Sequence, residues 1–173
     1  MKRIALFFVA MVSISATLKA QDGSNYKSAI GGRLGTTYYD VLSFSYKNFI
    51  SKQGALEFNA GFGAKKYDHS DGHYNATTLS FALTYQHHFD IKPVEGLRWF
   101  IGGGATIFNT FSDGDEYDGF GFGIYPTGGI DYKFSGIPLN LTADVRPTIH
   151  VVGPGYYNSF YSNFGLAVRY TLK

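Results

Sequence analysis

The sequence contains no cysteine and few charged residues, which make up 16% of the chain. The absence of cysteine excludes disulfides and a lipid-modified N-terminal cysteine. The sparse charge forms no basic face of the kind that binds nucleic acid. After the first twenty residues there is also no apolar run that approaches the roughly 20 residues of a membrane-spanning helix. If the chain enters a membrane, it must therefore do so as a closed barrel.

The N-terminus has the pattern of a cleaved secretory signal peptide. Lys2 and Arg3 precede an apolar stretch, residues 4–16, that is too short to be a spanning helix. We expect cleavage after Ala20, which gives a signal peptide of residues 1–20 and one domain of residues 21–173. Cleavage removes three of the 15 basic residues and leaves 12 against 13 acidic ones, a net charge near −1.

Glycine and aromatic residues are abundant, with 22 Gly, 14 Tyr and 16 Phe. Together with the low charge and the absence of helical periodicity, they favour an all-β protein. The clearest pattern is in residues 138–150, which read PLNLTADVRPTIH. Alternate side chains there are apolar on one face, and polar or charged on the other. Such a strand suits a wall with hydrocarbon on one side and a polar filling on the other.

Seven further segments alternate in the same way. The eight predicted strands are residues 26–38, 42–50, 55–66, 76–89, 97–111, 120–134, 138–150 and 160–172. Polar loops are expected at residues 67–74, 112–118 and 152–159, and shorter turns lie between the other strands. Short turns on one side and long loops on the other are typical of outer-membrane barrels. The predicted fold class is an all-β, closed, eight-stranded antiparallel up-and-down transmembrane β-barrel, preceded by the cleaved signal peptide.

A soluble lipocalin-like barrel would show the same alternation with its apolar face inward. The polar face here favours the membrane barrel, because it is mostly Gly, Ser, Thr and Ala, whereas a solvated exterior would carry many more charges. Aromatic residues at the strand ends also predict two interfacial girdles. One girdle comprises Phe49, Phe89, Trp99, Tyr132, Phe134 and Tyr170, and the other Tyr38, Phe62, Phe111, Phe120 and Phe160.

The few charges on the polar face have both signs. They are Arg33, Lys47, Glu57, Lys65, Arg98, Asp131, Lys133, Asp144, Arg146 and Arg169. Because the interior of an eight-stranded barrel is just wide enough for side chains, we predict that these residues pair in one network that fills it. The alternative is a narrow pore for small solutes, gated by exchange of ion pairs.

Two loops contain residue types that bind metals. His69, Asp71 and His73 are weak candidates for a transition-metal site, and a solvated polar loop is the simpler interpretation. A cluster of four acidic residues could hold a divalent cation among lipopolysaccharide phosphates, although a hydrophilic loop is again the simpler interpretation. That group comprises Asp113, Asp115, Glu116 and Asp118. No cofactor is expected.

A lipid A-modifying enzyme is a further alternative. Hydrolysis would require Ser, His and an acid within hydrogen-bond reach. His150 is predicted near the outer rim, not far from Ser159 and Ser162, while His87 and His88 fall at the opposite end. No His-x-Ser pair occurs, so we expect no catalytic residues and no enzymatic activity.

Two prolines lie inside predicted strands, where proline cannot donate to the ladder. If the turn between these strands centres on Gly136, Pro126 is opposite Arg146 and Pro147 is opposite Tyr125. The simpler interpretation is a bulge at each proline. The sharper one is a lateral seam in the outer half of the barrel that admits a lipid tail.

Five stretches are characteristic: residues 29–35 (AIGGRLG), 54–57 (GALE), 97–104, 137–147 and 164–172. They resemble stretches of small eight-stranded outer-membrane β-barrel proteins of the Bacteroidetes type, similar to OmpX and the OmpA barrel. One departure is the end of the chain, where Leu172 and Lys173 follow the aromatic Tyr170. The resemblance implies the outer membrane of a Gram-negative bacterium, and contact with its lipids, with lipopolysaccharide and with the barrel-assembly machinery. It brings no firm activity, so we expect a monomer with a structural or surface-interaction role.

Overall fold

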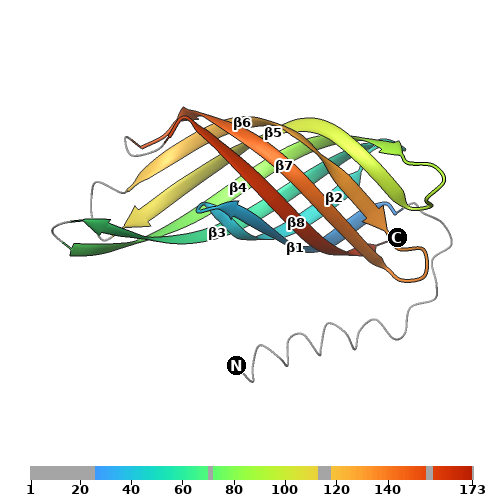
Figure 1. The fold of residues 1–173 in the computed structure, drawn as a ribbon, viewed down its shortest axis with the longest axis horizontal. Helices are drawn as coiled ribbons and strands as arrows, with labels where there is room; N and C mark the ends of the chain where they lie inside the picture. The colour runs from blue at the N-terminus through green and yellow to red at the C-terminus, as the bar shows by residue number, and fades with distance from the viewer. Residues whose placement is uncertain (1–25, 70–71, 113–117, 155–157, 173) are drawn as a thin grey trace, which may run out of the picture.

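The computed structural model describes residues 26–69, 72–112, 118–154 and 158–172. The expected signal peptide, residues 1–20, lies outside them. The strands are β1 (Ser28–Thr37), β2 (Asp40–Phe49), β3 (Gly54–His69), β4 (Gly72–Asp90), β5 (Leu97–Ser112), β6 (Gly119–Lys133), β7 (Leu139–Val152) and β8 (Phe160–Leu172). Each pairs with its neighbours in sequence, and β1 pairs with β8 (Figure 1). The predicted closed eight-stranded antiparallel up-and-down barrel is confirmed. Within the described ranges, no helix has the length and apolar character to cross a membrane.

The two ends of the barrel differ (Figure 1). The short-turn end contains residues 50–53, 91–96 and 134–138, together with the first and last described residues. The hairpin end contains the tip of the β3–β4 hairpin and the two-residue link between β1 and β2. Connections of these lengths join adjacent antiparallel strands directly, which is why the strand order follows the sequence.

The wall of the barrel has an inverted arrangement of polarity. Large apolar side chains on the outward face are 36–64% exposed, and they include Leu83, Ile101, Ile130 and Leu166. The alternate side chains point into the bore, where Arg33, Lys47, Glu57 and Arg169 have no exposed surface. The sequence alternation therefore predicted correctly which face of each strand is buried.

The expected polar loop at residues 67–74 is wrong. Tyr67 pairs with Tyr74 and Asp68 with His73, so β3 and β4 continue almost to the tip of their hairpin. Loss of the apolar alternation marked the expected end of each strand. A ladder of backbone hydrogen bonds does not depend on that alternation, so the strands extend further than the pattern.

Candidate functional site

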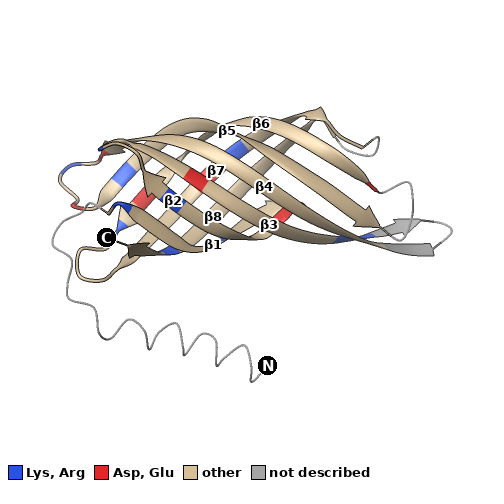
Figure 2. Cartoon of the chain, turned by 180° about the vertical axis from the view of Figure 1, so that it is seen from behind, with Lys and Arg blue, Asp and Glu red and all other residues tan. Residues whose placement is uncertain are grey.

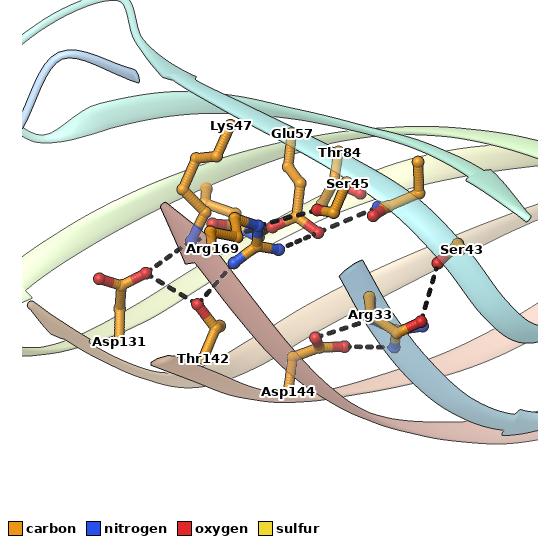
Figure 3. Close-up of polar contacts among 12 residues, drawn as sticks. Arg33, Ser43, Ser45, Lys47, Glu57, Thr84, Asp131, Thr142, Asp144 and Arg169 are labelled. Atoms are coloured by element: carbon orange, nitrogen blue, oxygen red, sulfur yellow. Dashed lines mark hydrogen bonds and ion pairs between the residues drawn. The ribbon is translucent and has the colours of Figure 1, made fainter. Parts of the chain in front are cut away.

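The bore contains a balanced set of buried charges. Its four bases are Arg33, Lys47, Arg146 and Arg169, and its four acids are Asp40, Glu57, Asp131 and Asp144; each is at most 7% exposed. Most charged positions of the wall lie between its middle and the short-turn end (Figure 2). Figure 3 shows the central part of the network, with side chains from several strands converging. The four positive and four negative charges of this set balance, and two further cations, Arg98 and Lys133, are buried nearer the short-turn end.

Arg33 on β1 and Asp144 on β7 make a two-point ion pair across the bore (Figure 3). The Arg33 Nε donates to Asp144 Oδ2 at 3.0 Å, and its Nη2 donates to Oδ1 at 2.7 Å. The Arg33 Nη1 also donates to Asp40. Arg146 Nε donates to the same Asp144 Oδ1 at 2.9 Å. Parallel bonds of this kind fix both the position and the orientation of a guanidinium.

Glu57 on β3 is the centre of the network. Its Oε1 accepts from Arg146 Nη2 at 2.7 Å and lies 2.9 Å from Arg169 Nη2. Its Oε2 lies 3.7 Å from Lys47 Nζ and accepts from Gln86 Nε2 at 2.8 Å. One fully buried carboxylate thus contacts three cations, a geometry that compensates for its loss of hydration.

Asp131 on β6 continues the network towards the short-turn end. Its Oδ2 accepts from Lys47 Nζ at 2.6 Å and from the Thr142 hydroxyl at 3.0 Å. Its Oδ1 accepts from Asn140 at 2.7 Å, and the Tyr26 hydroxyl lies within 3.3–3.4 Å of both oxygens. The ion pairs therefore run without interruption from Asp40 to Asp131, and these packed side chains fill this part of the bore.

Three of the predicted interior charges make contacts near the strand ends. Arg98 is at the mouth of the short-turn end, where its Nε donates to the exposed Asp90 at 2.8 Å. Lys133 donates to the carbonyls of Phe134 and Ile137. Lys65 is exposed, and its Nζ lies 5.2 Å from the Tyr38 ring centroid. These three residues lie near the strand ends, and their inclusion in one network with the other seven stays a prediction.

Aromatic side chains, which the sequence reasoning missed, close the bore towards the hairpin end. Tyr39 and Phe108 stack with ring centroids 5.1 Å apart, and His150 packs edge-on against both. Tyr161 also packs against His150, with ring centroids 5.5 Å apart. One feature of the sequence could have predicted this closure: Phe108 is at an inward position of β5, and the residue opposite it on β6 is Gly121. A Cβ at Gly121 would lie 1.9 Å from the Phe108 ring, so the glycine leaves room for it.

The remaining histidine candidates, His150 and His87, lie at opposite ends of the barrel, where they pair with Gly123 and Gly54. His150 Nδ1 lies 3.2 Å from the Asn158 carbonyl oxygen, among the aromatic rings just described. His87 Nδ1 is 3.4 Å from the Tyr85 hydroxyl on the exposed face.

The metal candidates are described only in part. His69 and His73 lie on the β3–β4 hairpin without described side chains, and Asp71 lies outside the described residues. Asp113, Asp115 and Glu116 also lie outside them, whereas Asp118 accepts a hydrogen bond from the Ser112 N–H. In the part of the chain that the structure describes, no three His, Cys, Asp or Glu residues form a metal-binding group.

The β6–β7 ladder is interrupted at the two prolines. Ile124 pairs with Ile149 and Gly128 with Val145, but the described residues 125–127 and 146–148 do not pair across this ladder. Counting inward from either pair places Pro126 opposite Pro147, so the expected register was wrong by one residue. Tyr125 and Arg146 occupy the bore behind the interruption. Admission of a lipid tail at this seam stays a prediction.

No protein-family model matches this sequence, and no curated protein matches it. Among solved structures, the barrel is similar to the crystal structure of Neisserial surface protein A (NspA). The TM-score is 0.54 and the identity 13%, over 84% of this chain and 94% of that one. It is also similar to Ail, the attachment invasion locus protein of Yersinia pestis, with a TM-score of 0.49 and 11% identity over 88% of this chain and all of that one. The likeness to NspA supports the small-barrel fold; the Bacteroidetes type stays a prediction.

Proposed function

We propose that this protein is an integral outer-membrane barrel with a structural or surface-interaction role. The observation that carries the proposal is the inverted polarity of the wall, with eight charges buried in the bore and large apolar side chains exposed around the outside. In water, this arrangement would leave an extensive apolar surface unprotected. Against lipid, it satisfies both faces of every strand.

Aromatic side chains at both ends of the outward face support the same placement. Phe89 and Trp99 stack at 4.4 Å near the short-turn end, and Phe111, Phe120 and Phe160 are exposed towards the other end. Belts of this kind lie at the two interfaces of a membrane barrel. We assign the short-turn end to the periplasm and the hairpin end to the cell surface.

A non-conducting, non-catalytic role fits the filled bore. The ion-pair network and the aromatic closure occupy the space that a pore would need. NspA, the similar barrel, is called a surface protein. We therefore place the function of this chain in its surface loops and outward face. The expected result in a planar bilayer is no conductance, and stable unitary currents from the purified protein would favour the pore instead.

Because the chain lacks cysteine, single cysteines can test location and orientation together. Asn158→Cys introduces a thiol beside the β7–β8 connection, and Lys52→Cys introduces one in a short turn; both positions are exposed. The protein is expressed with residues 1–20, the expected signal peptide, in a Gram-negative host, and the cells are treated with a membrane-impermeant maleimide. Asn158→Cys should react in intact cells, whereas Lys52→Cys should react only after the outer membrane is permeabilised. Equal labelling in intact cells, or recovery in the soluble fraction, would contradict the proposal.

A further inference from the structure

A cavity of about 820 Å³ opens at the short-turn end of the barrel. It is lined by Tyr26, Lys27, Phe49, Ser51, Lys52, Gln53, His88, Asp90 and Arg98. Backbone hydrogen bonds hold two sides of its rim, from Phe49 N to the Lys27 carbonyl and from His88 N to the Gln53 carbonyl, both at 2.8 Å. The cavity is therefore formed by strands and turns that backbone hydrogen bonds hold in place.

The rim of this cavity is positively charged. Lys27, Lys52 and Arg98 supply three cations, whereas Asp90 is the one acid among the lining residues. Asp90 is already engaged with Arg98 at 2.8 Å. The two lysines are exposed and leave two positive charges at the opening. A net positive mouth with low-dielectric walls raises the local concentration of anions.

The imidazole of His88 lies at the inner end of the cavity and is 1% exposed. Phe49 and Phe100 hold its ring, with centroids at 4.9 and 5.1 Å. Among the described residues, neither ring nitrogen has a hydrogen-bond partner. The nearest acid is Asp131, whose Oδ2 is 4.0 Å from Nε2 and already accepts from Lys47. A buried N–H without an acceptor is unfavourable, and a bound acceptor would relieve it.

Phe49 was expected in the outward aromatic girdle, but its side chain lines this mouth. Its ring contacts Tyr26 edge-on at 5.1 Å, and the Arg98 guanidinium lies 5.6 Å from its centroid. The wall next to His88 is therefore apolar, so an anion entering from the rim would be partly withdrawn from water. Charge-assisted hydrogen bonds strengthen in such surroundings.

From this arrangement, we infer that the mouth at the short-turn end binds a small oxyanion, a carboxylate or phosphate group, between the basic rim and the imidazole of His88. The cation pair at the opening attracts the anion, and a ring N–H of His88 donates to it. Under the proposed function this mouth faces the periplasm. The binding itself does not depend on that orientation.

The test uses the purified protein in detergent micelles, titrated separately with sodium phosphate and sodium acetate at constant ionic strength. The ring resonances of His88, followed by NMR, should shift saturably. Comparison of the two affinities shows whether the site prefers a phosphate group or a carboxylate group. The double variant Lys27→Gln/Lys52→Gln should bind about tenfold more weakly, as expected for loss of the attracting charges. Lys92→Gln, which removes a charge at the same end but outside the cavity lining, should bind as the wild type does.

Absence of a saturable shift with both anions would overturn the inference, as would equal affinities for wild type and the double variant. The rim lysines are exposed, so their replacement should leave the barrel folded even if a variant of His88 does not fold. Because the measurement is made in micelles, a negative result would leave the proposed outer-membrane location standing. Failure of the cysteine-labelling experiment would likewise leave the anion site standing.

Discussion

Pro126 of β6 and Pro147 of β7 stand directly opposite each other in a hydrogen-bonded position of the ladder. The Phe134 N–H donates to the Leu139 carbonyl at 3.0 Å, and hydrogen-bonded pairs recur at every second residue from there. Steps of two lead through Gly128 and Val145 to the two prolines. Neither proline has an N–H to donate. Both bonds of this pair are therefore missing, and two facing carbonyls have no donor on the opposite strand.

We predict rapid hydrogen exchange beside this proline pair. The amides of Ile124, Gly128, Val145 and Ile149 bracket the gap, and those of the unbroken β4–β5 ladder serve as an internal control. An interrupted ladder opens locally at lower free energy than a continuous one. Exchange measured on the folded protein should therefore be faster at the four bracketing amides. Equal protection in both ladders would show that the interruption has no dynamic effect.

Restoring one donor should close the gap. Pro147→Val supplies an N–H directed at the Pro126 carbonyl, worth about 1 kcal/mol for a typical net hydrogen bond. Part of this gain is offset, because loss of proline increases the entropy of the unfolded chain by a comparable amount. The sharper readout is therefore slower exchange at Val145 and Ile149 in the variant. Unchanged rates there would count against the register that places the two prolines opposite each other.

Asp144→Ala should destabilise the barrel strongly. It leaves Arg33 and Arg146 buried without one of their carboxylates, a loss of about 3–5 kcal/mol in free energy of unfolding. The matched control is Asp90→Ala, which removes the acid of an ion pair whose carboxylate side chain is 71% exposed. That change should cost less than about 1 kcal/mol. Urea denaturation in lipid vesicles measures both, and similar losses would argue against a special role for the buried network.

Gly165→Ala should also be destabilising. A Cβ there would lie 2.1–2.4 Å from the Arg33 guanidinium, which cannot move aside without stretching its bonds to Asp144 and Asp40. Overpacking of this kind costs about 1–3 kcal/mol. Gly136→Ala is the control, because no atom lies within 4 Å of its Cβ position, and it should change stability by less than about 0.5 kcal/mol. Equal stability of the two variants would mean that the bore can rearrange around Arg33.

Leu166→Arg tests the outward face. Leu166 is 64% exposed in the middle of β8, and Arg at such a depth in lipid should cost about 2–4 kcal/mol. Leu166→Met keeps an apolar side chain of similar size and should cost less than about 1.5 kcal/mol. Both are measured as unfolding free energies in vesicles. An Arg variant as stable as the Met variant would place this position in water.

Sequence alternation predicted the fold well, because strand parity alone decides which side chains point inward. Lys47, Glu57 and Arg169 are all in the bore for that reason. Their partners could not be predicted, because an ion pair such as Arg33–Asp144 joins strands that are not consecutive in sequence. It depends on how the strands are staggered around the barrel and on the reach of each side chain. Asp40 was missed for a different reason: the two-residue link before it has no Gly or Pro to mark where β2 begins.

The error of one residue in the β6–β7 register has a local cause. The connection at residues 134–138 includes a tight turn in which Leu139 N donates to the Ile137 carbonyl at 2.8 Å. The turn is therefore not centred on Gly136, which was the assumption behind the expected register. The alternation pattern already excluded the expected register, because residues directly opposite each other on antiparallel strands point to the same face. Pro126 is on the outward face and Arg146 is in the bore, so the two cannot be opposite each other.

β1 pairs with β8 from Ser28–Leu172 to Gly35–Gly165. The backbone hydrogen bonds on one edge of the first strand therefore form only when the last strand is present. Until β8 arrives, β1 has an open edge of N–H and C=O groups that hydrocarbon cannot solvate. Under the proposed outer-membrane location, a chain that lacks β8 would therefore leave the edge of β1 unpaired in the bilayer. Pairing of the first strand with the last is then a condition for a stable barrel in lipid.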